Sequence, residues 1–330
     1  MQAVCIHTNG GPEVLRYEEV DLAKPQNNEV KIRHTFIAVN YSDVNVRRGD
    51  FYLQNKTVFP IILGNEASGH ITELGPDVTD FKVGDRVAYA GAGAAFYQST
   101  GAYATERVMD SKHLVKVPDG VSDELAAVSL LKGITAYIAT HQMGKIKPGQ
   151  WVLVHAAASG VGMLITQMAK RRGASVIGTV SSAEKVAMAQ KMGCDHTVPS
   201  DNFIEGVRKI APTGVNVVFD GIGKTTFVPS FDCAAPFASL INYGNVSGTV
   251  PPIELMQLSL KGSLKVARAG FSSVHQMQGG FKATSALIFE MIKDKEIQVV
   301  LGKTFKLQDA QYAHLQLERR DNIGSIVMKP

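Results

Sequence analysis

The chain has 330 residues, a length that allows two domains and a large hydrophobic core. Hydrophobic residues make up 45% and charged residues 19%, as in ordinary globular proteins, and no apolar run approaches the roughly 18 residues of a membrane span. The net charge of +4 is small and spread along the chain, so nucleic acid is not implied as a partner. The N-terminus lacks the basic start and long apolar region of a signal peptide, and a cytoplasmic protein is expected.

The three cysteines of the chain are Cys5, Cys194 and Cys233. They lie far apart in the sequence and form no CxxC pair, so neither a disulfide framework nor a cysteine-rich structural zinc site is indicated. This cysteine usage fits a reducing compartment.

The first region of the chain, from residue 1 to about 121, is predicted to be a small β-rich domain. Its short strands are punctuated by Gly and Pro, a spacing typical of a barrel-like fold rather than of alternating strands and helices. A helical stretch is expected at 44–48. The predicted strands cover residues 29–38, 67–74, 85–89 and 113–117.

In the second region, from about 122 to 269, predicted helices and strands alternate. The apolar runs at 216–220 and 238–243 are typical of strands buried in a parallel sheet. Residues 262–267 are expected to form the last strand of that sheet.

The third region, from about residue 270 onward, is too short to form a domain of its own. We therefore expect it to return to the first region and complete it. Its predicted elements are a helix near 275–293, a strand at 303–305, a helix at 309–319 and a strand at 325–328. The expected domains are residues 1–122 with 270–330, and residues 123–269.

The most informative motif is WVLVHAAASGVG at residues 151–162. An apolar run with strand character ends in small residues that open a predicted helix over 161–172, and a second strand is expected at 174–180. Small residues let the pyrophosphate of a dinucleotide approach the backbone at the helix N-terminus, where N–H groups and the helix dipole attract it. A glycine-rich turn alone is weak evidence, but strand, turn, helix and strand at these lengths predict a Rossmann nucleotide site.

The residues after the second strand indicate which nicotinamide cofactor binds. An NAD site usually has Asp or Glu there, which accepts a hydrogen bond from the ribose 2′-hydroxyl. Here the strand is followed by Ser181, Ser182 and Lys185, whose hydroxyls and ammonium suit a 2′-phosphate, while Glu184 falls in the following helix. The alternative is an ordinary helix start, with a serine as N-cap and Lys185 as a solvated charge. The pattern favours NADPH.

Short motifs occur in a fixed order along nearly the whole chain. They are GGPEVL at 10–15, VNYSD at 39–43, LGNEASG at 63–69, VGDRV at 83–87, LKGITA at 131–136, AAASGVG at 156–162, FDGIG at 219–223 and YGNVSG at 243–248. In this order they resemble the zinc-free quinone oxidoreductase (zeta-crystallin-like) branch of the medium-chain dehydrogenase/reductase family. The resemblance implies an α/β fold: a Rossmann doubly wound parallel sheet, plus a β-rich GroES-like barrel domain that the C-terminal tail completes.

The resemblance also bears on a catalytic metal. Zinc-dependent relatives have Cys at the position of Asn40 and His at the position of Asn65, and carboxamides are poor zinc ligands. Glu66 alone cannot hold a tetrahedral metal, and the segment 91–101 has no cysteine for structural zinc. No metal site is therefore expected. Without a Lewis acid, the reaction that fits is hydride transfer to an acceptor already made electron-poor by conjugation.

Three residues are implied as catalytic: Asn40, Asp43 and Tyr52. Asn40 could donate a hydrogen bond to the oxygen of a reduced quinone, and Asp43 could orient it or bind water. Both residues also stand where helix caps are preferred, so capping is the alternative. Tyr52, or Phe51 beside it, could supply an aromatic ring, with packing in a loop as the alternative.

Other residues are implied to bind the cofactor. Thr135 resembles the family residue whose hydroxyl lies against the nicotinamide. Lys132 could contact the phosphates or ribose, and the alternative is a structural lysine at a helix start. Gly244 and Asn245 follow a strand whose carboxyl end should face the binding crevice.

Two cofactor-site positions depart from the family pattern. Ser159 stands where close relatives have glycine, so a hydroxyl must fit beside the pyrophosphate. Ser200 stands where some NADPH-binding relatives have a tyrosine against the 2′-phosphate, which makes Lys185 more important. The complete set of residues expected to bind the cofactor is Lys132, Thr135, Ala158, Ser159, Gly160, Val161, Gly162, Ser181, Ser182, Lys185, Ser200, Gly244 and Asn245.

The function implied is an NADPH-dependent quinone oxidoreductase, with a quinone or enone as its small-molecule substrate. One alternative is an enoyl or alkenal reductase, for which Tyr41, Tyr52 and Tyr97 are possible proton donors. Another is an NADPH-binding protein with little turnover. No membrane insertion is expected. A homodimer through the edge strand of the nucleotide-domain sheet is expected, with Leu264 and Val266 in the contact. The alternative is a monomer in which the charge of Lys265 protects the edge strand.

Overall fold

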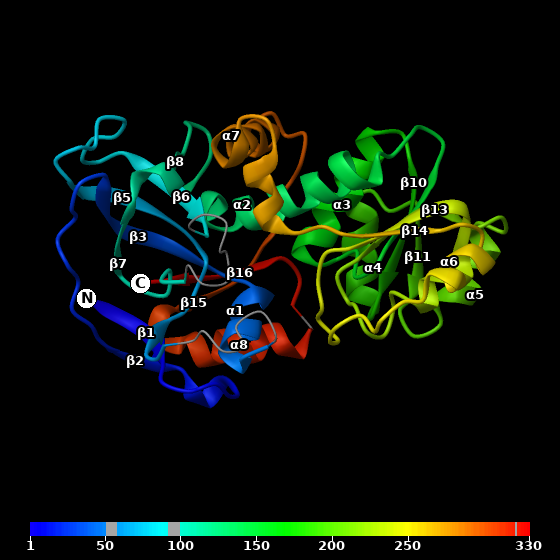
Figure 1. Ribbon diagram of the computed structural model, residues 1–330, viewed down its shortest axis with the longest axis horizontal. Coiled ribbons are helices and arrows are strands. Elements are labelled where there is room, and N and C mark those ends of the chain that lie inside the picture. Colours follow the sequence, from blue (N-terminus) through cyan, green and yellow to red (C-terminus); the bar gives the residue numbers. More distant parts are fainter. Residues whose placement is uncertain (51–57, 92–99, 321) are drawn as a thin grey trace. The chain divides into compact units, whose positions relative to one another are not determined.

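The computed structural model describes residues 1–50, 58–91, 100–320 and 322–330. The chain forms two compact units. The first comprises Met1–Leu131 and Val274–Pro330, and the second comprises Lys132–Ser273 (Figure 1). Helix α2 (Asp123–Tyr137) runs through the junction between Leu131 and Lys132.

The main sheet of the first unit is largely antiparallel. Its strands are β3 (Glu29–Val39), β5 (Glu66–Leu74), β6 (Arg86–Ala90), β7 (Glu106–Asp110), β8 (Val115–Lys116), β15 (Leu301–Lys306) and β16 (Ser325–Lys329). They follow the order β15-β16-β3-β5-β6-β8, and β7 also pairs with β3. Because β16 pairs with both β3 and β15, the C-terminal segment completes the sheet of the N-terminal region, which confirms the predicted return of the chain.

A smaller sheet lies at the start of the chain. It consists of β1 (Gln2–Ile6), β2 (Arg16–Glu19) and β4 (Ile61–Ile62), in the order β2-β1-β4. Strands β1 and β4 share one hydrophobic core with the main sheet, as does helix α8 (Ala310–Arg319), which contributes Ala310 and Ala313. The core therefore fixes α8 against the strands of the first unit.

Short helical elements connect strands of the first unit. Helix α1 (Tyr41–Arg48) begins directly after β3 and ends at Gly49, whose φ of 74° is the left-handed conformation that favours glycine. The predicted strand at 113–117 is shortened, because Ser111–His113 form a 3-10 turn before β8.

The prediction of a long helix near 275–293 is wrong for the first residues of that range. Residues Phe271–Gln276 form a 3-10 turn, and α7 covers only Gly280–Lys293. Gly279 and Gly280 have φ values of 72° and 58°, a left-handed backbone that a right-handed helix cannot continue through.

The second unit is built on six parallel strands. They are β9 (Trp151–Val154), β10 (Ser175–Val180), β11 (His196–Pro199), β12 (Val215–Asp220), β13 (Ala234–Asn242) and β14 (Lys265–Arg268). Their order is β11-β10-β9-β12-β13-β14, the order of a doubly wound Rossmann sheet, which confirms the predicted fold class. Val152, Leu153 and Val154 are all fully buried, as expected for a strand covered on both faces.

The last strand starts later than the sequence predicts. Ser263 adopts a left-handed φ of 57°, and Leu264 is only 5% exposed and belongs to the hydrophobic core of the second unit. Leu264 is therefore not available as a contact residue of an edge strand, contrary to the prediction.

Helices connect the strands of the second unit. They are α3 (Gly160–Arg171), α4 (Ala183–Lys191), α5 (Phe203–Ile210) and α6 (Leu255–Leu260), and α2 continues into a π-helical turn at Ile138–Gly144. Helix α3 begins within a residue of its predicted start at 161. Among the described residues, no helix combines the length and the apolar character needed to cross a membrane.

Candidate functional site

The turn after β9 leaves the N-terminus of α3 accessible. Ala156 takes a left-handed φ of 51°, and exposed Ser159 caps α3 by accepting a hydrogen bond of 3.2 Å from the N–H of Gly162. A Cβ on Gly162 would lie 2.4 Å from the carbonyl oxygen of Ala156, so the helix can pack this closely only with glycine there. Buried Ala158 completes the turn. An N-terminus with this geometry suits a phosphate group.

A second cluster forms where β10 and β11 end. Lys185 Nζ donates to Ser181 Oγ over 3.1 Å. The N–H of Ser200 donates to the carbonyl of Val180 over 3.0 Å, which brings Ser200 next to the residue that follows β10. Ser182 is the N-cap residue of α4. The structure thus brings together a cation and three serines predicted from separate segments, a combination suited to a phosphate.

The loop after β13 approaches the loop after β12. A Cβ on Gly244 would lie 2.6 Å from the carbonyl oxygen of Gly221, so only glycine permits this approach. Asn245 Oδ1 accepts a hydrogen bond of 2.9 Å from Arg268 Nη1. Both predicted residues therefore lie at the same edge of the parallel sheet as Ser159.

Tyr243 belongs to this site but was not predicted. Its hydroxyl oxygen is buried beside Ser159, and it makes no hydrogen bond of normal geometry with the residues that the structure describes. Burial, followed by the charge of Asp220, raises the pKa of Tyr243, so the phenol stays protonated. Its sequence signal was present, since Tyr243 opens the YGNVSG motif.

Lys132 and Thr135 lie three residues apart on α2, and therefore on one face of that helix. Their exposed fractions are 8% and 9%. Both belong to the second unit, and their predicted contacts with the cofactor stay predictions.

The first unit contains a buried cluster of carboxylates and carboxamides. Asn40 Nδ2 donates to Glu66 Oε2 over 3.0 Å, and Asn65 Nδ2 donates to Asp43 Oδ1 over 2.9 Å. The other oxygen of Glu66 accepts from the backbone N–H of Leu131 over 2.8 Å. Asp43, Asn65 and Glu66 are fully buried, and Asn40 is 5% exposed.

Asp43 makes the capping contact that the sequence offered as an alternative. Its Oδ2 accepts from the backbone N–H of Asn40 over 2.8 Å at the start of α1. The same oxygen accepts from the hydroxyl of Tyr103 over 3.1 Å. Capping does not exclude the predicted catalytic role, which stays a prediction. Tyr52, the third predicted catalytic residue, lies outside the described residues.

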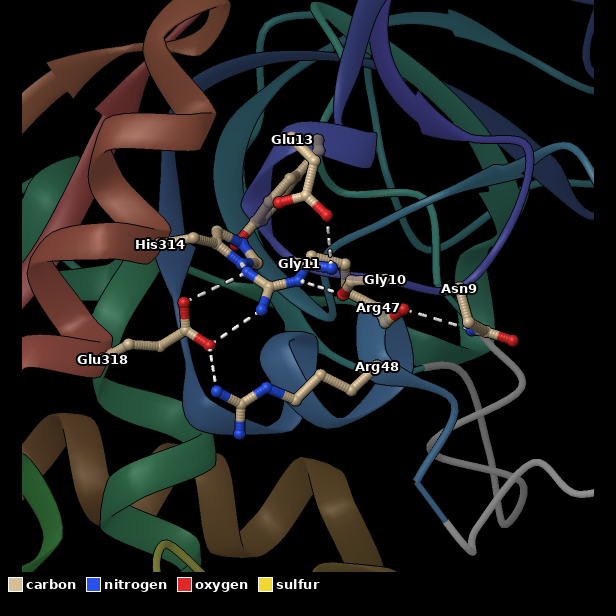
Figure 2. A network of polar contacts seen from close by, with 9 residues as sticks. Asn9, Gly10, Gly11, Glu13, Arg47, Arg48, His314 and Glu318 are labelled. Atoms are coloured by element: carbon tan, nitrogen blue, oxygen red, sulfur yellow. Dashed lines mark hydrogen bonds and ion pairs between the residues drawn. The ribbon is translucent and has the colours of Figure 1, made fainter.

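The network extends from Asp43 to the C-terminal helix. Tyr103 contacts His314 of α8, and His314 contacts Arg47. Arg47 in turn pairs with Glu318 over 2.7 Å (Figure 2). Burial, followed by the charge of Arg47, lowers the pKa of His314 to about 3. No sequence motif pointed to these residues.

The carboxamides of the cluster serve as hydrogen-bond donors to carboxylates. In the part of the chain that the structure describes, no group of three or more His, Cys, Asp and Glu side chains could hold a metal ion. The predicted lack of a catalytic zinc depends on the residue types at Asn40 and Asn65 and stays a prediction.

Comparisons with known proteins agree with this fold. Residues 26–119 match the alcohol dehydrogenase GroES-like domain, and residues 160–288 match the zinc-binding dehydrogenase domain. The chain is 38% identical to 2-haloacrylate reductase from Burkholderia sp., over 100% of this chain and 99% of that protein. It is 37% identical to a quinone oxidoreductase from Pseudomonas aeruginosa, over 97% of each.

A solved structure is similar over the full length. The quinone oxidoreductase of Escherichia coli, complexed with NADPH, matches with a TM-score of 0.92 and 34% identity, covering 100% of both chains. The two units therefore define a dehydrogenase/reductase with a GroES-like and a Rossmann domain. The chain belongs to the quinone oxidoreductase branch of the medium-chain dehydrogenase/reductase family.

Proposed function

We propose that the protein is an NADPH-dependent quinone oxidoreductase that transfers a hydride to a quinone or similar conjugated acceptor without a metal. The observation that carries this proposal is the buried cluster in which Asn40 and Asn65 donate to Glu66 and Asp43. Carboxamides that donate to carboxylates provide no Lewis acid to polarise an alcohol or ketone. An acceptor that is already electron-poor fits this site better.

The second unit fits the phosphates of NADPH. We propose that the turn of Ala158 and Ser159, with the first residues of α3 (Gly160, Val161 and Gly162), holds the pyrophosphate. The buried hydroxyl of Tyr243 beside Ser159 supports this fit, because a buried donor usually has a partner.

The tips of β10 and β11 would bind the adenosine 2′-phosphate. A cation and several hydroxyls are present there, from Ser181, Ser182, Lys185 and Ser200. The two residues between the end of β10 and the start of α4 include no Asp or Glu. For the nicotinamide half we propose Lys132, Thr135, Gly244 and Asn245.

When bound, NADPH supplies the hydride, and the residues of the first unit act on the acceptor. We propose that Asn40 donates a hydrogen bond to the acceptor oxygen, which gains negative charge as it is reduced. Glu66 orients the Asn40 carboxamide, and Asp43 fixes the backbone at the same residue. We propose Tyr52 as an aromatic contact for the acceptor.

A second candidate is an enoyl or alkenal reductase. The 38% identity to 2-haloacrylate reductase favours it, because the name of that relative describes an unsaturated substrate. Such chemistry benefits from a proton donor at the α-carbon. Of the three candidate tyrosines, Tyr41 lies at the first position of α1, and Tyr52 and Tyr97 lie outside the described residues.

The two candidates and a protein without turnover are separated by one steady-state assay. NADPH oxidation is measured with 1,4-benzoquinone, 9,10-phenanthrenequinone and 2-hexenal at equal concentrations. Preference for the quinones is expected. Preference for the enal would replace the first candidate with the second, and no oxidation with any acceptor would indicate a binding protein.

We further propose a homodimer formed through the second unit. Strand β14 is an edge of its sheet, and α6 exposes 81% of Leu255, 65% of Met256 and 80% of Leu260. Unpaired strand edges and large apolar side chains are usually covered in soluble proteins. Light scattering should show a dimer, and Val266→Pro, which removes a ladder donor, should yield monomers. A wild-type monomer at micromolar concentration would contradict this.

A further inference from the structure

A chain of buried hydrogen bonds in the first unit joins α8 to Asp43. Arg47 Nη1 donates to His314 Nδ1 over 3.0 Å, and Tyr103 Oη lies 3.0 Å from His314 Nε2 and 3.1 Å from Asp43 Oδ2. All four side chains are fully buried. Figure 2 shows Arg47 of α1 next to His314 and Glu318 of α8.

The chemistry of these groups determines which atom donates and which accepts in each hydrogen bond. A guanidinium only donates, so His314 Nδ1 accepts and the imidazole proton lies on Nε2. A carboxylate only accepts, so Tyr103 donates to Asp43 and accepts from His314. Because arginine does not release its proton, the chain cannot conduct protons from solvent. What these hydrogen bonds can do is hold Asp43 in one position.

Asp43 in turn orients Asn65. Because Asp43 accepts from Asn65 Nδ2 over 2.9 Å, Asn65 Oδ1 must face away from that carboxylate. This oxygen is buried and has no hydrogen-bond partner among the described residues. The ring of Tyr103 also packs on Gly64, where a Cβ would lie 2.2 Å from the ring. A buried acceptor fixed in this way is suited to a donor group on a ligand.

We propose that Arg47, His314 and Tyr103 are positioning residues, which hold Asp43 so that Asn65 Oδ1 accepts a hydrogen bond from the hydroxyl that forms on the acceptor. The inference rests on the proposed function. There the acceptor gains a hydride from NADPH and a proton from solvent water, leaving NADP⁺ and a hydroquinone. A quinone has no hydroxyl, so Asn65 interacts favourably only as the acceptor is reduced. The contact therefore affects turnover and not NADPH binding.

The same unit contains a matched control pair. Tyr89 Oη lies 2.9 Å from His34 Nε2, and both side chains are buried. His34 Nδ1 donates to the carbonyl of Ala104 over 2.7 Å, so Nε2 must accept from Tyr89. The hydrogen bond of this tyrosine–histidine pair has the opposite direction, and the pair continues to the carbonyl of Ala104 rather than to Asp43.

The experiment compares Tyr103→Phe, His314→Leu and His314→Gln with the control Tyr89→Phe. For each, kcat and KM are measured with 1,4-benzoquinone, and the Kd of NADPH is measured by fluorescence. Side-chain amide signals of ¹⁵N-asparagine are recorded without substrate, with Asn65 assigned by the loss of its signals in Asn65→Ala. The thermal midpoint of each variant shows whether it is folded.

Tyr103→Phe and His314→Leu should lower kcat about 10-fold, the lower end of what a hydrogen bond to a charged group supports. His314→Gln can both accept from Arg47 and donate to Tyr103, so it should retain kcat within about threefold. Tyr89→Phe should keep the wild-type kcat. The Kd of NADPH should stay unchanged, and the Asn65 signals should move only in Tyr103→Phe and His314→Leu.

Equal kcat values in Tyr103→Phe and Tyr89→Phe, or equal losses in the two His314 variants, would overturn the inference. A wild-type protein that reduces no acceptor would contradict the proposed function instead. In that case the amide signals decide: Asn65 signals that do not move in Tyr103→Phe would overturn the positioning chain as well.

Discussion

The two units build their candidate sites in different ways. In the second unit the site consists of turns after strands β9, β10, β11 and β13, and exposed residues such as Ser159 and Ser181 provide the polar groups. In the first unit the site consists of buried side chains, and Asp43, Glu66 and Arg47 are fully buried.

This difference has consequences for how each site tolerates change. A site made of backbone turns keeps its shape when one side chain is altered, because the turns are held by the sheet. A buried polar network depends on every member, because removal of one leaves its partners desolvated and unsatisfied. Variants of the first unit should therefore change turnover and stability, and variants of the second unit should change cofactor affinity alone.

The largest effect is expected for Asp43→Ala. Three donors, the N–H of Asn40, Asn65 Nδ2 and the Tyr103 hydroxyl, would lose their acceptor. The free energy of unfolding should fall by about 3 kcal/mol and kcat/KM for the quinone by about 100-fold, since each buried donor left unsatisfied costs about 1–3 kcal/mol. Chemical denaturation and steady-state kinetics measure both, with the Kd of NADPH unchanged. A variant with wild-type stability and turnover would show that the three hydrogen bonds to Asp43 contribute neither to stability nor to turnover.

The next effect is expected for Lys185→Ala in the second unit. The affinity for NADPH should fall about 10- to 150-fold, because a charge-assisted hydrogen bond to phosphate contributes about 1.5–3 kcal/mol. The affinity for NADH, which lacks the 2′-phosphate, should change little. Lys191→Ala, at an exposed position of the same helix, is the control. Equal losses for both cofactors would show that Lys185 does not bind the 2′-phosphate.

A smaller effect is expected from pH. The pKa of His314 is about 3 in the folded protein and ordinarily 6.5, so the unfolded chain binds more protons between these values. The free energy of unfolding should therefore fall as the pH drops below 6.5, by up to about 1.4 kcal/mol per pH unit from this group. His314→Gln should weaken the dependence between pH 6 and 4. A His314→Gln protein with the wild-type slope would mean that His314 takes up its proton without unfolding.

No effect is expected from a chelator. Purified protein should contain substoichiometric zinc and keep full activity, because Asn40 and Asn65 occupy the positions where zinc-dependent relatives carry ligands. Metal analysis before and after treatment measures this. One zinc per chain, lost together with activity, would contradict the account of the first unit.

The same contrast explains what the sequence could predict. Strand β9, its turn and α3 were predicted within a residue because their signals are local: an apolar run, small residues and a helical period. The return of the C-terminal tail to the first region followed from a tail too short to fold alone, but its pairing through β16 with β3 was not predicted.

The polar network of the first unit was only partly predictable. Asn40 and Asp43 lie in one motif, but Arg47 meets His314 across 267 positions of sequence, and no local pattern encodes such a contact. A helical pattern does not reveal the break before α7, because glycine is allowed within such a pattern, whereas Gly279 and Gly280 both have a left-handed backbone here. Tyr243 was not predicted because the burial of its hydroxyl beside Ser159 is a tertiary contact that no local pattern encodes.

The most direct test of the central claim is a single turnover of NADPH with 1,4-benzoquinone. The enzyme loaded with NADPH, or with NADPH deuterated at the transferred position, is mixed with the quinone, and the loss of nicotinamide absorbance is followed. One NADPH should be consumed per quinone, the reaction should be slower with deuterium, and the amplitude should be the same in the presence of a chelator. Oxidation that requires a metal, or no oxidation while NADPH stays bound, would contradict metal-free hydride transfer to the quinone.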